Sequence, residues 1–247
     1  MKLNHIQKQD LNKVTKDEIY KYIQSMDTEK TTKLPREETL AEQLGVSRIT
    51  VRNALSQLAA EGIILRKHGK GTFVNVEATQ IKVNFSPAED FRNVIINSGY
   101  HVDVKIEKIS EREANADEAQ KLNLSPKTKL IVIEKMFFAD EFPAVYCVDR
   151  IPLELYNGKI NKHDLSKPLF QLIREKLNKE IIWDKVELVT TTNEEQPFLN
   201  KFFNTEKVKS FLNCNVINFD EDDQPTVYSN EYIDTNFIRF NLIRQKA

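Results

Sequence analysis

The sequence predicts an α+β fold in two parts: a small N-terminal domain of three helices followed by a hairpin, and a larger C-terminal domain around a mainly antiparallel sheet. Apolar residues recur at helical spacing through residues 11–60, whereas paired stretches of strand-like alternation dominate after residue 100. A chain of 247 residues is long enough for two domains. We predict that the first domain spans residues 1–76, an extended linker 77–83 and the second domain 84–247.

The first domain begins with a helix predicted from Leu11 to Met26. Pro35 is expected to open a second helix, because proline at the first helical position gives up only an N–H that would have no partner. Gly45 is expected to end that helix in the left-handed conformation, and Ser47 to cap the next one. Two helices joined by about three residues that include glycine are typical of a helix-turn-helix.

The third helix has two different sides. One side is apolar and is expected to face the core: Val51, Ala54, Leu55 and Leu58. The other side carries Ile49, Arg52, Asn53 and Ser56, with Arg48 on its flank. Arginine, asparagine and an aliphatic group are what a helix needs to contact base edges in a major groove. An ordinary amphipathic surface helix would look similar, but the glycine-tipped hairpin predicted over residues 63–74 favours a winged helix-turn-helix.

This stretch closely resembles the DNA-binding domain of GntR-type bacterial transcriptional regulators over roughly residues 15–76. The resemblance is carried by Leu34-Pro35-Arg36-Glu37-Glu38, by Val46-Ser47-Arg48-Ile49-Thr50-Val51-Arg52 and by Gly69-Lys70-Gly71-Thr72-Phe73-Val74. It implies binding to a double-stranded DNA operator. By this resemblance Arg48 and Arg52 would contact DNA, Ser47 and Thr50 would contact phosphate, and His68 and Gly69 would contact DNA from the wing tip.

Three further residues complete the predicted DNA-binding set. The family usually has an arginine where this chain has Glu38, and we expect Arg36 to substitute for it. Ile49 lies near the centre of the outward side, where it could bury against a thymine methyl group. Lys70 is expected to contact phosphate without regard to sequence.

The second domain is predicted as alternating helices and strands. In order these are a helix opened by the capping signature at Ser86 and ending at Ser98-Gly99, a strand from Tyr100, a helix over 115–124, a hairpin of 130–139 with 143–151, a helix over 165–177, a strand over 181–191, a helix over 196–203, a hairpin of 210–219 with 226–233, and a last strand over 237–243.

This order is similar to the UTRA effector-binding domain, which resembles chorismate lyase and defines the HutC branch of the GntR regulators. The residues that carry the resemblance over about 83–246 are Ala139-Asp140-Glu141-Phe142-Pro143, Pro152, Asp222-Asp223-Gln224-Pro225, Tyr228-Ser229 and Arg239-Phe240. The resemblance implies a homodimer that binds a small-molecule effector. The effector-binding residues that it suggests are Ser86, Lys135, Phe137, Cys147, Tyr228 and Arg239.

The expected effector site has lost charges that sugar-phosphate-binding relatives use. Phe137 stands in place of a second basic residue, Cys147 in place of an acid, and Val227 in place of a glutamate. Because charge-assisted hydrogen bonds confer affinity for a phosphosugar, we expect an effector that is different, less polar or absent. An anionic metabolite or a sugar derivative is among the candidates. Alternative roles are a plain N-cap for Ser86, a solvated strand lysine for Lys135 and core-edge packing for Tyr228.

Composition sets the remaining expectations. The chain is 40% hydrophobic and 30% charged, as in a soluble globular protein. It has no run approaching the ~18 apolar residues of a membrane span and no apolar signal core, so we expect a cytoplasmic protein without a membrane partner. Cys147 and Cys214 are the only cysteines, and no metal-ligand spacing or cofactor motif is present.

We therefore predict a DNA-binding regulator, most simply a repressor that binds an inverted-repeat operator as a homodimer and is released by an effector. Residues 1–76 carry a charge balance of +4 and the remainder −5, which suits an N-terminal part that alone faces phosphates. A regulator whose second domain only dimerises is the alternative. A lyase-like enzyme is disfavoured, because no catalytic constellation stands out.

Overall fold

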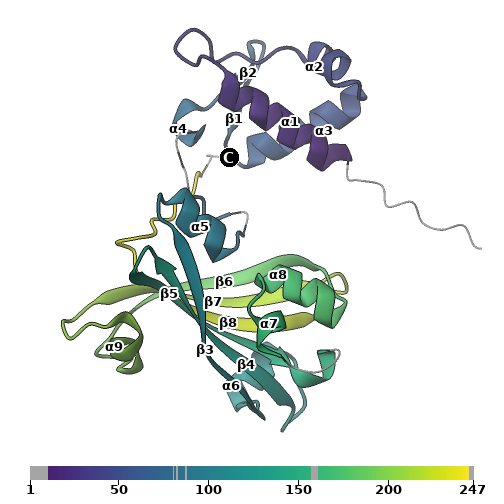
Figure 1. The fold of residues 1–247 in the computed structure, drawn as a ribbon. Helices are drawn as coiled ribbons and strands as arrows, with labels where there is room; N and C mark the ends of the chain where they lie inside the picture. The colour runs from purple at the N-terminus through teal and green to yellow at the C-terminus, as the bar shows by residue number, and fades with distance from the viewer. Residues whose placement is uncertain (1–10, 80, 82, 87, 157–160, 245–247) are drawn as a thin grey trace, which may run out of the picture. The chain divides into compact units, whose positions relative to one another are not determined.

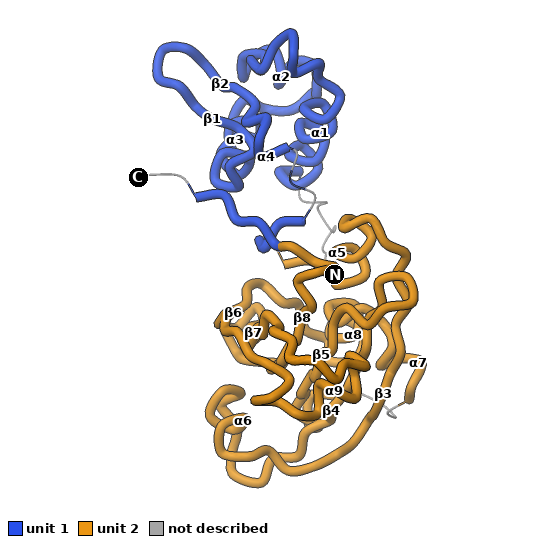
Figure 2. Tube along the Cα trace, turned by 90° about the vertical axis from the view of Figure 1, so that its left-hand side faces the viewer, with its two compact units in different colours: residues 1–87, 240–247 blue, residues 88–239 orange. Residues whose placement is uncertain are grey.

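The computed structural model describes residues 11–79, 81, 83–86, 88–156 and 161–244. The chain forms two compact units, which are described separately. Unit 1 comprises residues 1–87 together with 240–247, and unit 2 comprises residues 88–239 (Figure 2). The chain therefore passes from one unit to the other twice.

Unit 1 is a winged helix-turn-helix (Figure 1). Its elements are α1 (Leu11–Ser25), α2 (Glu37–Leu44), α3 (Arg48–Ala60), β1 (Ile64–Lys67), β2 (Gly71–Val74) and α4 (Val76–Thr79). Strands β1 and β2 pair antiparallel and form the wing. The three long helices pack around one core that includes Ile19, Ile23, Leu40, Val51, Leu55 and Leu58. The predicted helices and hairpin are thus confirmed.

Most of the predicted helix ends are confirmed, but the start of α2 is not. Gly45 ends α2 with φ 65°, and the Ser47 side chain accepts a hydrogen bond from the Thr50 N–H. Pro35, however, lies outside the helix, because Arg36 holds the extended N-cap conformation (φ −65°, ψ 154°) and the first helical residue is Glu37.

The linker and the end of the chain also differ from prediction. Helix α4 occupies part of the segment that we expected to be extended. The predicted last strand over 237–243 is absent. Its residue Asn241 instead makes one parallel bridge with Asn84, in which the Asn241 N–H donates to Val83 O and the Phe85 N–H donates to Asn241 O. Beyond it, Ile243 packs against the core of unit 1.

Unit 2 contains a six-stranded, fully antiparallel sheet in the order β3-β4-β5-β8-β7-β6. The strands are β3 (Val102–Glu113), β4 (Lys129–Ala139), β5 (Phe142–Pro152), β6 (Ile181–Thr192), β7 (Ser210–Asp220) and β8 (Pro225–Ile233). The helices are α5 (Phe91–Asn97), α6 (Ala116–Lys121), η1 (Leu153–Leu155), α7 (Lys162–Leu165), α8 (Leu169–Leu172), η2 (Ile173–Leu177) and α9 (Phe198–Phe203). The predicted α+β class is confirmed.

The two faces of this sheet carry different cores. The Lys135 face contains Lys135, Cys147, Glu231 and Cys214, which lie opposite one another on β4, β5, β8 and β7. Next to them on this face, α7, α8 and η2 pack on Ile131, Ile133 and Ile151. Figure 1 shows α7 and α8 against the sheet. The Tyr228 face contains Val132, Arg150, Tyr228 and Ile217 in the same way, and α6 and α9 pack on it.

Two predicted helices of unit 2 need correction. The helix expected to begin at Ser86 begins at Phe91, because Asp90 is the N-cap and its side chain accepts the Arg92 N–H. The helix expected over 165–177 is divided into α7, α8 and η2. Pro168 has ψ 139°, outside the helical range, and it separates α7 from α8.

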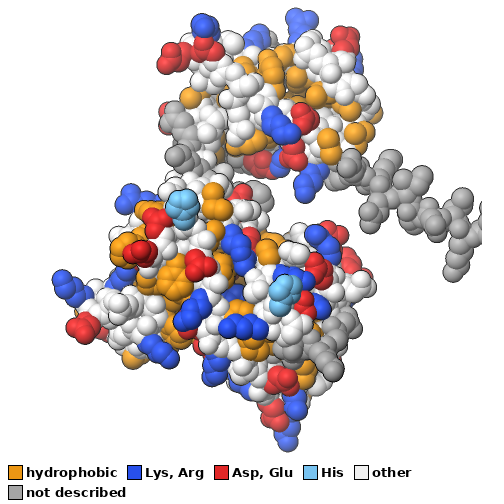
Figure 3. Space-filling view, in the orientation of Figure 1, with side chains coloured by type: hydrophobic (Ala, Val, Ile, Leu, Met, Phe, Trp, Pro, Cys, Tyr) orange, Lys and Arg blue, Asp and Glu red, His pale blue; other side chains and the backbone are white. Residues whose placement is uncertain are grey.

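Neither unit shows a helix long and apolar enough to cross a membrane among the residues that are described. Figure 3 shows both signs of charge interspersed with hydrophobic side chains on the visible face of unit 2. This visible face therefore does not form the single-sign field that attracts nucleic acid.

Gly62 offers a test of how the end of the chain supports unit 1. It has φ 75°, and an added Cβ would lie 2.6 Å from Ile243 Cγ2. Gly45 has a similar φ of 65° but no atom within 4 Å of such a Cβ. Alanine at either position should cost about 1–2 kcal/mol of stability for the left-handed conformation. Gly62→Ala should cost more, because it also displaces Ile243.

The measurement is native-state hydrogen exchange of the α3 amides. Combining Gly62→Ala with Ile243→Ala should remove the crowding part of the loss and leave the part shared with Gly45→Ala. Equal losses for the two glycine variants would show that Ile243 does not hold this position.

Candidate DNA interface and effector site

Helix α3 presents the predicted outward side to solvent. Val51, Ala54, Leu55 and Leu58 are all buried, so the apolar side is confirmed as core. On the other side Ile49 is 70% exposed, the largest exposed fraction among the large hydrophobic residues that are described. At the start of the helix, the Ser47 and Thr50 hydroxyl oxygens lie 2.8 Å apart and both residues remain accessible.

The two arginines of this side are held by the acids of α2. Glu37 accepts hydrogen bonds from Arg52 Nε at 3.0 Å and Nη2 at 2.8 Å. Glu38 forms an ion pair with Arg48 at 2.5 Å. The Glu37 carboxylate raises the pKa of Arg52 by its hydrogen bond and its charge. Glu38, the residue that departs from the family pattern, thus neutralises a predicted DNA contact in the free protein.

Arg66 joins the same surface and was not predicted from the sequence. Its Nη2 donates to Ser56 Oγ at 3.1 Å and to Arg52 O at 3.3 Å, which ties β1 of the wing to the outward side of α3. Arg36 is exposed at the start of α2. A side-chain contact between a strand and a helix that are separated in sequence leaves no local pattern, so the position of Arg66 could be found only in the structure.

The wing tip extends away from the core of unit 1. His68, Gly69 and Lys70 are all exposed, and Gly69 takes φ 69° in the turn that the Lys70 N–H closes onto Lys67 O. The wing residues, the start of α3 and the start of α2 are the parts of unit 1 that carry the predicted DNA-binding residues. The structure places each of them at an accessible position.

In unit 2, a buried polar cluster lies in the middle of the Lys135 face. Lys135 Nζ donates to Asp149 Oδ2 at 3.1 Å, and both side chains are almost fully buried. Ser229 Oγ donates to Asp149 Oδ1 at 2.7 Å, and Cys147 Sγ donates to the same oxygen at 3.2 Å. Lys135 is therefore not the solvated strand lysine of the alternative interpretation. Burial and the Asp149 charge raise the pKa of Cys147 well above its ordinary value.

Glu231 lies beside this cluster and was not predicted. It stands opposite Cys147 on β5 and Cys214 on β7. Burial, then the charges of Asp149 and Asp184, raise its pKa to about 8. On β5 and β8 the acids of this face thus lie at 149 and 231, not at 147 and 227 where the family comparison placed them, and Asp184 of β6 lies on the same face. The Lys135 ammonium, the Asp149 carboxylate and the Glu231 carboxyl group, which is protonated below its raised pKa, make a site that can both donate hydrogen bonds to a ligand and accept them.

Phe137 also belongs to the Lys135 face, since it lies two residues from Lys135 on β4. Its ring contacts Phe91 of α5 at a centroid distance of 5.5 Å, and the Arg92 guanidinium lies 5.7 Å from its centre. Three of the predicted effector residues, at 135, 137 and 147, are therefore brought together by the sheet. Helix α5 closes over one end of their face.

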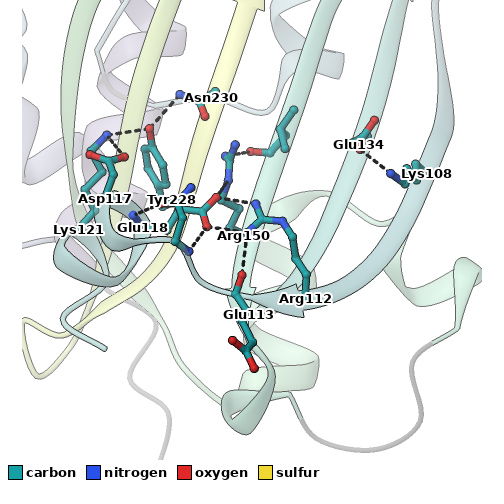
Figure 4. Close-up of polar contacts among 12 residues, drawn as sticks. Lys108, Arg112, Glu113, Asp117, Glu118, Lys121, Glu134, Arg150, Tyr228 and Asn230 are labelled. Atoms are coloured by element: carbon teal, nitrogen blue, oxygen red, sulfur yellow. Dashed lines mark hydrogen bonds and ion pairs between the residues drawn. The ribbon is translucent and has the colours of Figure 1, made fainter. Parts of the chain in front are cut away.

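Tyr228 does not belong to that group, because it lies on the opposite face of the sheet. Its hydroxyl contacts Lys121 Nζ at 2.9 Å and accepts from Asn230 Nδ2 at 3.0 Å (Figure 4). The Lys121 ammonium lies 4.4 Å and the Arg150 guanidinium 5.0 Å from its ring centre. The prediction that Tyr228 shares one pocket with Lys135 is wrong, because position 228 is one residue from Ser229 and side chains alternate along a strand.

The network around Tyr228 is held by Glu118 of α6 (Figure 4). Its carboxylate accepts hydrogen bonds from Arg112 and Arg150 at 2.6 Å and from the Asn115 N–H at 3.0 Å. Burial raises the pKa of Glu118, but the hydrogen bonds from Arg112 and Asn115 outweigh it and lower the pKa to about 2. These partners make the network a structural support for α6.

The last two predicted effector residues lie outside the cluster. Ser86 belongs to unit 1, and the helix expected to begin there has Asp90 as its N-cap, so the alternative role of Ser86 as a plain N-cap is wrong. Arg239 is exposed and is the last residue of unit 2.

Comparison with known proteins agrees with this division. Residues 11–74 match the model of bacterial regulatory proteins of the gntR family, and residues 97–239 match the model of the UTRA domain. The chain is 25% identical to the HTH-type transcriptional regulator YurK of Bacillus subtilis (strain 168), with 94% of this chain and 93% of the relative covered. It is also 25% identical to a probable fructoselysine utilization operon transcriptional repressor of Escherichia coli (strain K12), covering 85% and 84%.

A solved structure has the same fold over nearly the whole length. It is that of a possible transcriptional regulator, YydK, from Bacillus subtilis, with a TM-score of 0.74 and 20% identity over 95% of this chain and 99% of that chain.

The raised pKa of Glu231 predicts a pH dependence of stability. Its ordinary pKa is 4.5 and its folded value about 8, so between these values the folded protein holds a proton that the unfolded chain has released. The free energy of unfolding should therefore fall as pH rises from about 5 to 8, with a slope of up to about 1.4 kcal/mol per pH unit from this group. Glu231→Gln should lose this part of the slope.

Urea unfolding followed by Trp183 fluorescence measures this, because Trp183 is the only tryptophan and lies in unit 2. Glu206→Gln, on an exposed glutamate, is the control and should keep the wild-type slope. An unchanged slope in Glu231→Gln would mean that Glu231 is ionised in the folded protein at neutral pH.

Proposed function

Because this chain belongs to the UTRA-domain transcription regulators with a gntR-family DNA-binding domain, we propose that it is a homodimeric repressor whose DNA binding is relieved by a small-molecule effector. That it is a DNA-binding transcription regulator, and not an enzyme, follows from the two family matches. The further parts of the proposal concern the operator, the effector and the assembly.

The exposed side of α3 carries the DNA-binding part of the proposal. Arg48 and Arg52 flank the exposed Ile49, and the Glu37 and Glu38 carboxylates hold both guanidinium groups in defined positions. Two copies of this helix, related by a two-fold axis, would match the two halves of an inverted repeat. Repression is supported by the relative from Escherichia coli that is named as a probable repressor.

The polar cluster of the Lys135 face supports the effector-binding part. The patch contains a buried lysine, two carboxyl groups, a hydroxyl and a thiol. Burying such groups lowers stability unless they form hydrogen bonds with a ligand or with one another. Glu231 contributes to that cost, because burial and the charges of Asp149 and Asp184 raise its pKa. The alternative, a second domain that only dimerises, does not need a buried glutamate at this position.

The DNA-binding proposal predicts different behaviour for helix and wing. Arg52→Ala should cost roughly 1–3 kcal/mol of operator binding and much less on random DNA, because it removes a base contact. Lys70→Ala should weaken both DNAs about equally and lower the salt slope by about one, because it removes a phosphate contact. Fluorescence anisotropy at several salt concentrations measures both. If Arg52→Ala lost the same binding free energy on both DNAs, Arg52 would contact a phosphate and not a base.

The effector proposal predicts a ligand that stabilises unit 2. In a thermal-shift screen of metabolites, a compound at about one hundred times its Kd should stabilise the protein by about 2.7 kcal/mol. The same compound should weaken operator binding, and the operator should weaken the compound by the same factor. Glu231→Gln should lose the shift but keep operator binding without the compound. A screen in which compounds shift wild type and Glu231→Gln alike would place the ligand elsewhere.

A further inference from the structure

The two edges of the six-stranded sheet are built differently. Edge strand β3 carries alternating charges at Asp103, Lys105 and Glu107 and is interrupted by a bulge between Ile106 and Lys108. Charges and bulges are the usual means by which proteins prevent an edge strand from pairing with another chain. None of the large exposed hydrophobic residues described in the chain lies on β3.

Edge strand β6 has the opposite character. It runs for 12 residues, and among the described strands it pairs only with β7. Four of its large hydrophobic side chains are exposed: Ile182 62%, Trp183 44%, Leu188 51% and Val189 38%. A long and apolar edge with free backbone groups is a template for pairing with a further strand.

The order of residues on β6 matches β6 itself. In an antiparallel pair centred on Val186, Lys185 of each copy faces Glu187 of the other, and Trp183 faces Val189. All four side chains point to the Tyr228 face, because their partners on β7 are Phe219, Ile217, Asn215 and Asn213. Directly opposed residues of an antiparallel pair interact, and opposite charges there are stabilising.

Neighbouring registers lack this complementarity. Centring the pair on Lys185 or on Glu187 places two like charges opposite one another, which is destabilising. Centring it between Val186 and Glu187 leaves Lys185 opposite Leu188 and no ion pair across the strands. Only the register through Val186 gives two ion pairs and two aromatic–aliphatic pairs, and it is two-fold symmetric, as a closed dimer requires.

We propose that β6 is the dimer interface of this protein: it pairs antiparallel with β6 of a second copy about Val186 and joins the two sheets into one. The inference rests on the proposed homodimer and specifies its surface and register. Trp183 is already fixed for this contact, since it stacks on Phe219 at 3.9 Å and its Nε1 donates to Asp223 at 2.8 Å.

Charge exchange tests the register. Lys185→Glu and Glu187→Lys should each weaken dimerisation roughly tenfold, because each turns two attractions into two repulsions. The double variant should restore the wild-type dimer, and an equimolar mixture of the two single variants should form heterodimers. Lys105→Glu, the same charge change on the opposite edge, is the matched control and should leave dimerisation unchanged. Sedimentation equilibrium measures all five samples, with circular dichroism to verify folding.

Crosslinking tests the position of the axis. Val186→Cys should form a disulfide-linked dimer on oxidation with diamide, because the two copies of residue 186 lie opposite one another. Wild type should not, since Cys147 and Cys214 are buried. A protein that is monomeric at all concentrations would overturn the proposed homodimer. A stable dimer without the Val186→Cys crosslink, and without rescue in the double charge variant, would overturn the β6 interface alone.

Discussion

Successive side chains of a β-strand point to opposite faces of a sheet, and this alternation decides which polar groups of unit 2 can meet. Lys135, Cys147, Asp149, Ser229 and Glu231 come from three strands, yet they form one cluster because the register of β4, β5 and β8 places them on one face. A shift of one residue would bring Tyr146 and Arg150 to this face from β5, Tyr228 and Asn230 from β8, and Glu134 and Met136 from β4. The polar cluster therefore depends on the sheet register before it depends on any single side chain.

The same constraint explains what the sequence could predict. Helix α3 has a period that shows its two sides directly, so Val51 and Leu58 could be assigned to the core and Ile49 to solvent. The strands could be located, and their order as hairpins followed from the turns. The effector cluster could not be assembled from that information, because it needs the pairing of β5 with β8, which are far apart in sequence. Comparison with relatives placed acids at 147 and 227, whereas the structure has them two and four residues later, on the same face.

The two units differ in where their main ion pairs lie: those of Asp149 and Glu118 in unit 2 are buried, whereas those of Arg48 and Arg52 in unit 1 are exposed. In unit 2 the carboxylates of Asp149 and Glu118 are buried, and hydrogen-bond donors and cations of the same unit neutralise their charges. In unit 1 the ion pairs of Arg48 and Arg52 with α2 are exposed, where a pair contributes at most about 1 kcal/mol. Breaking such a pair therefore costs little free energy when the arginine moves to a phosphate or a base. The acids of α2 therefore orient the arginines without holding them back from DNA.

The double passage of the chain between the units affects how the protein is made. Unit 1 contains residues on both sides of unit 2 in sequence, and Ile243, which fills the space beside Gly62, leaves the ribosome only after residues 88–239 have been synthesised. Domains generally fold in order as they emerge. Here the winged domain emerges first but receives its last core contact after the sheet domain is complete. A nascent chain that stops within unit 2 thus has the residues of the DNA-binding surface but lacks the contact of Ile243 beside Gly62. The complete chain has both.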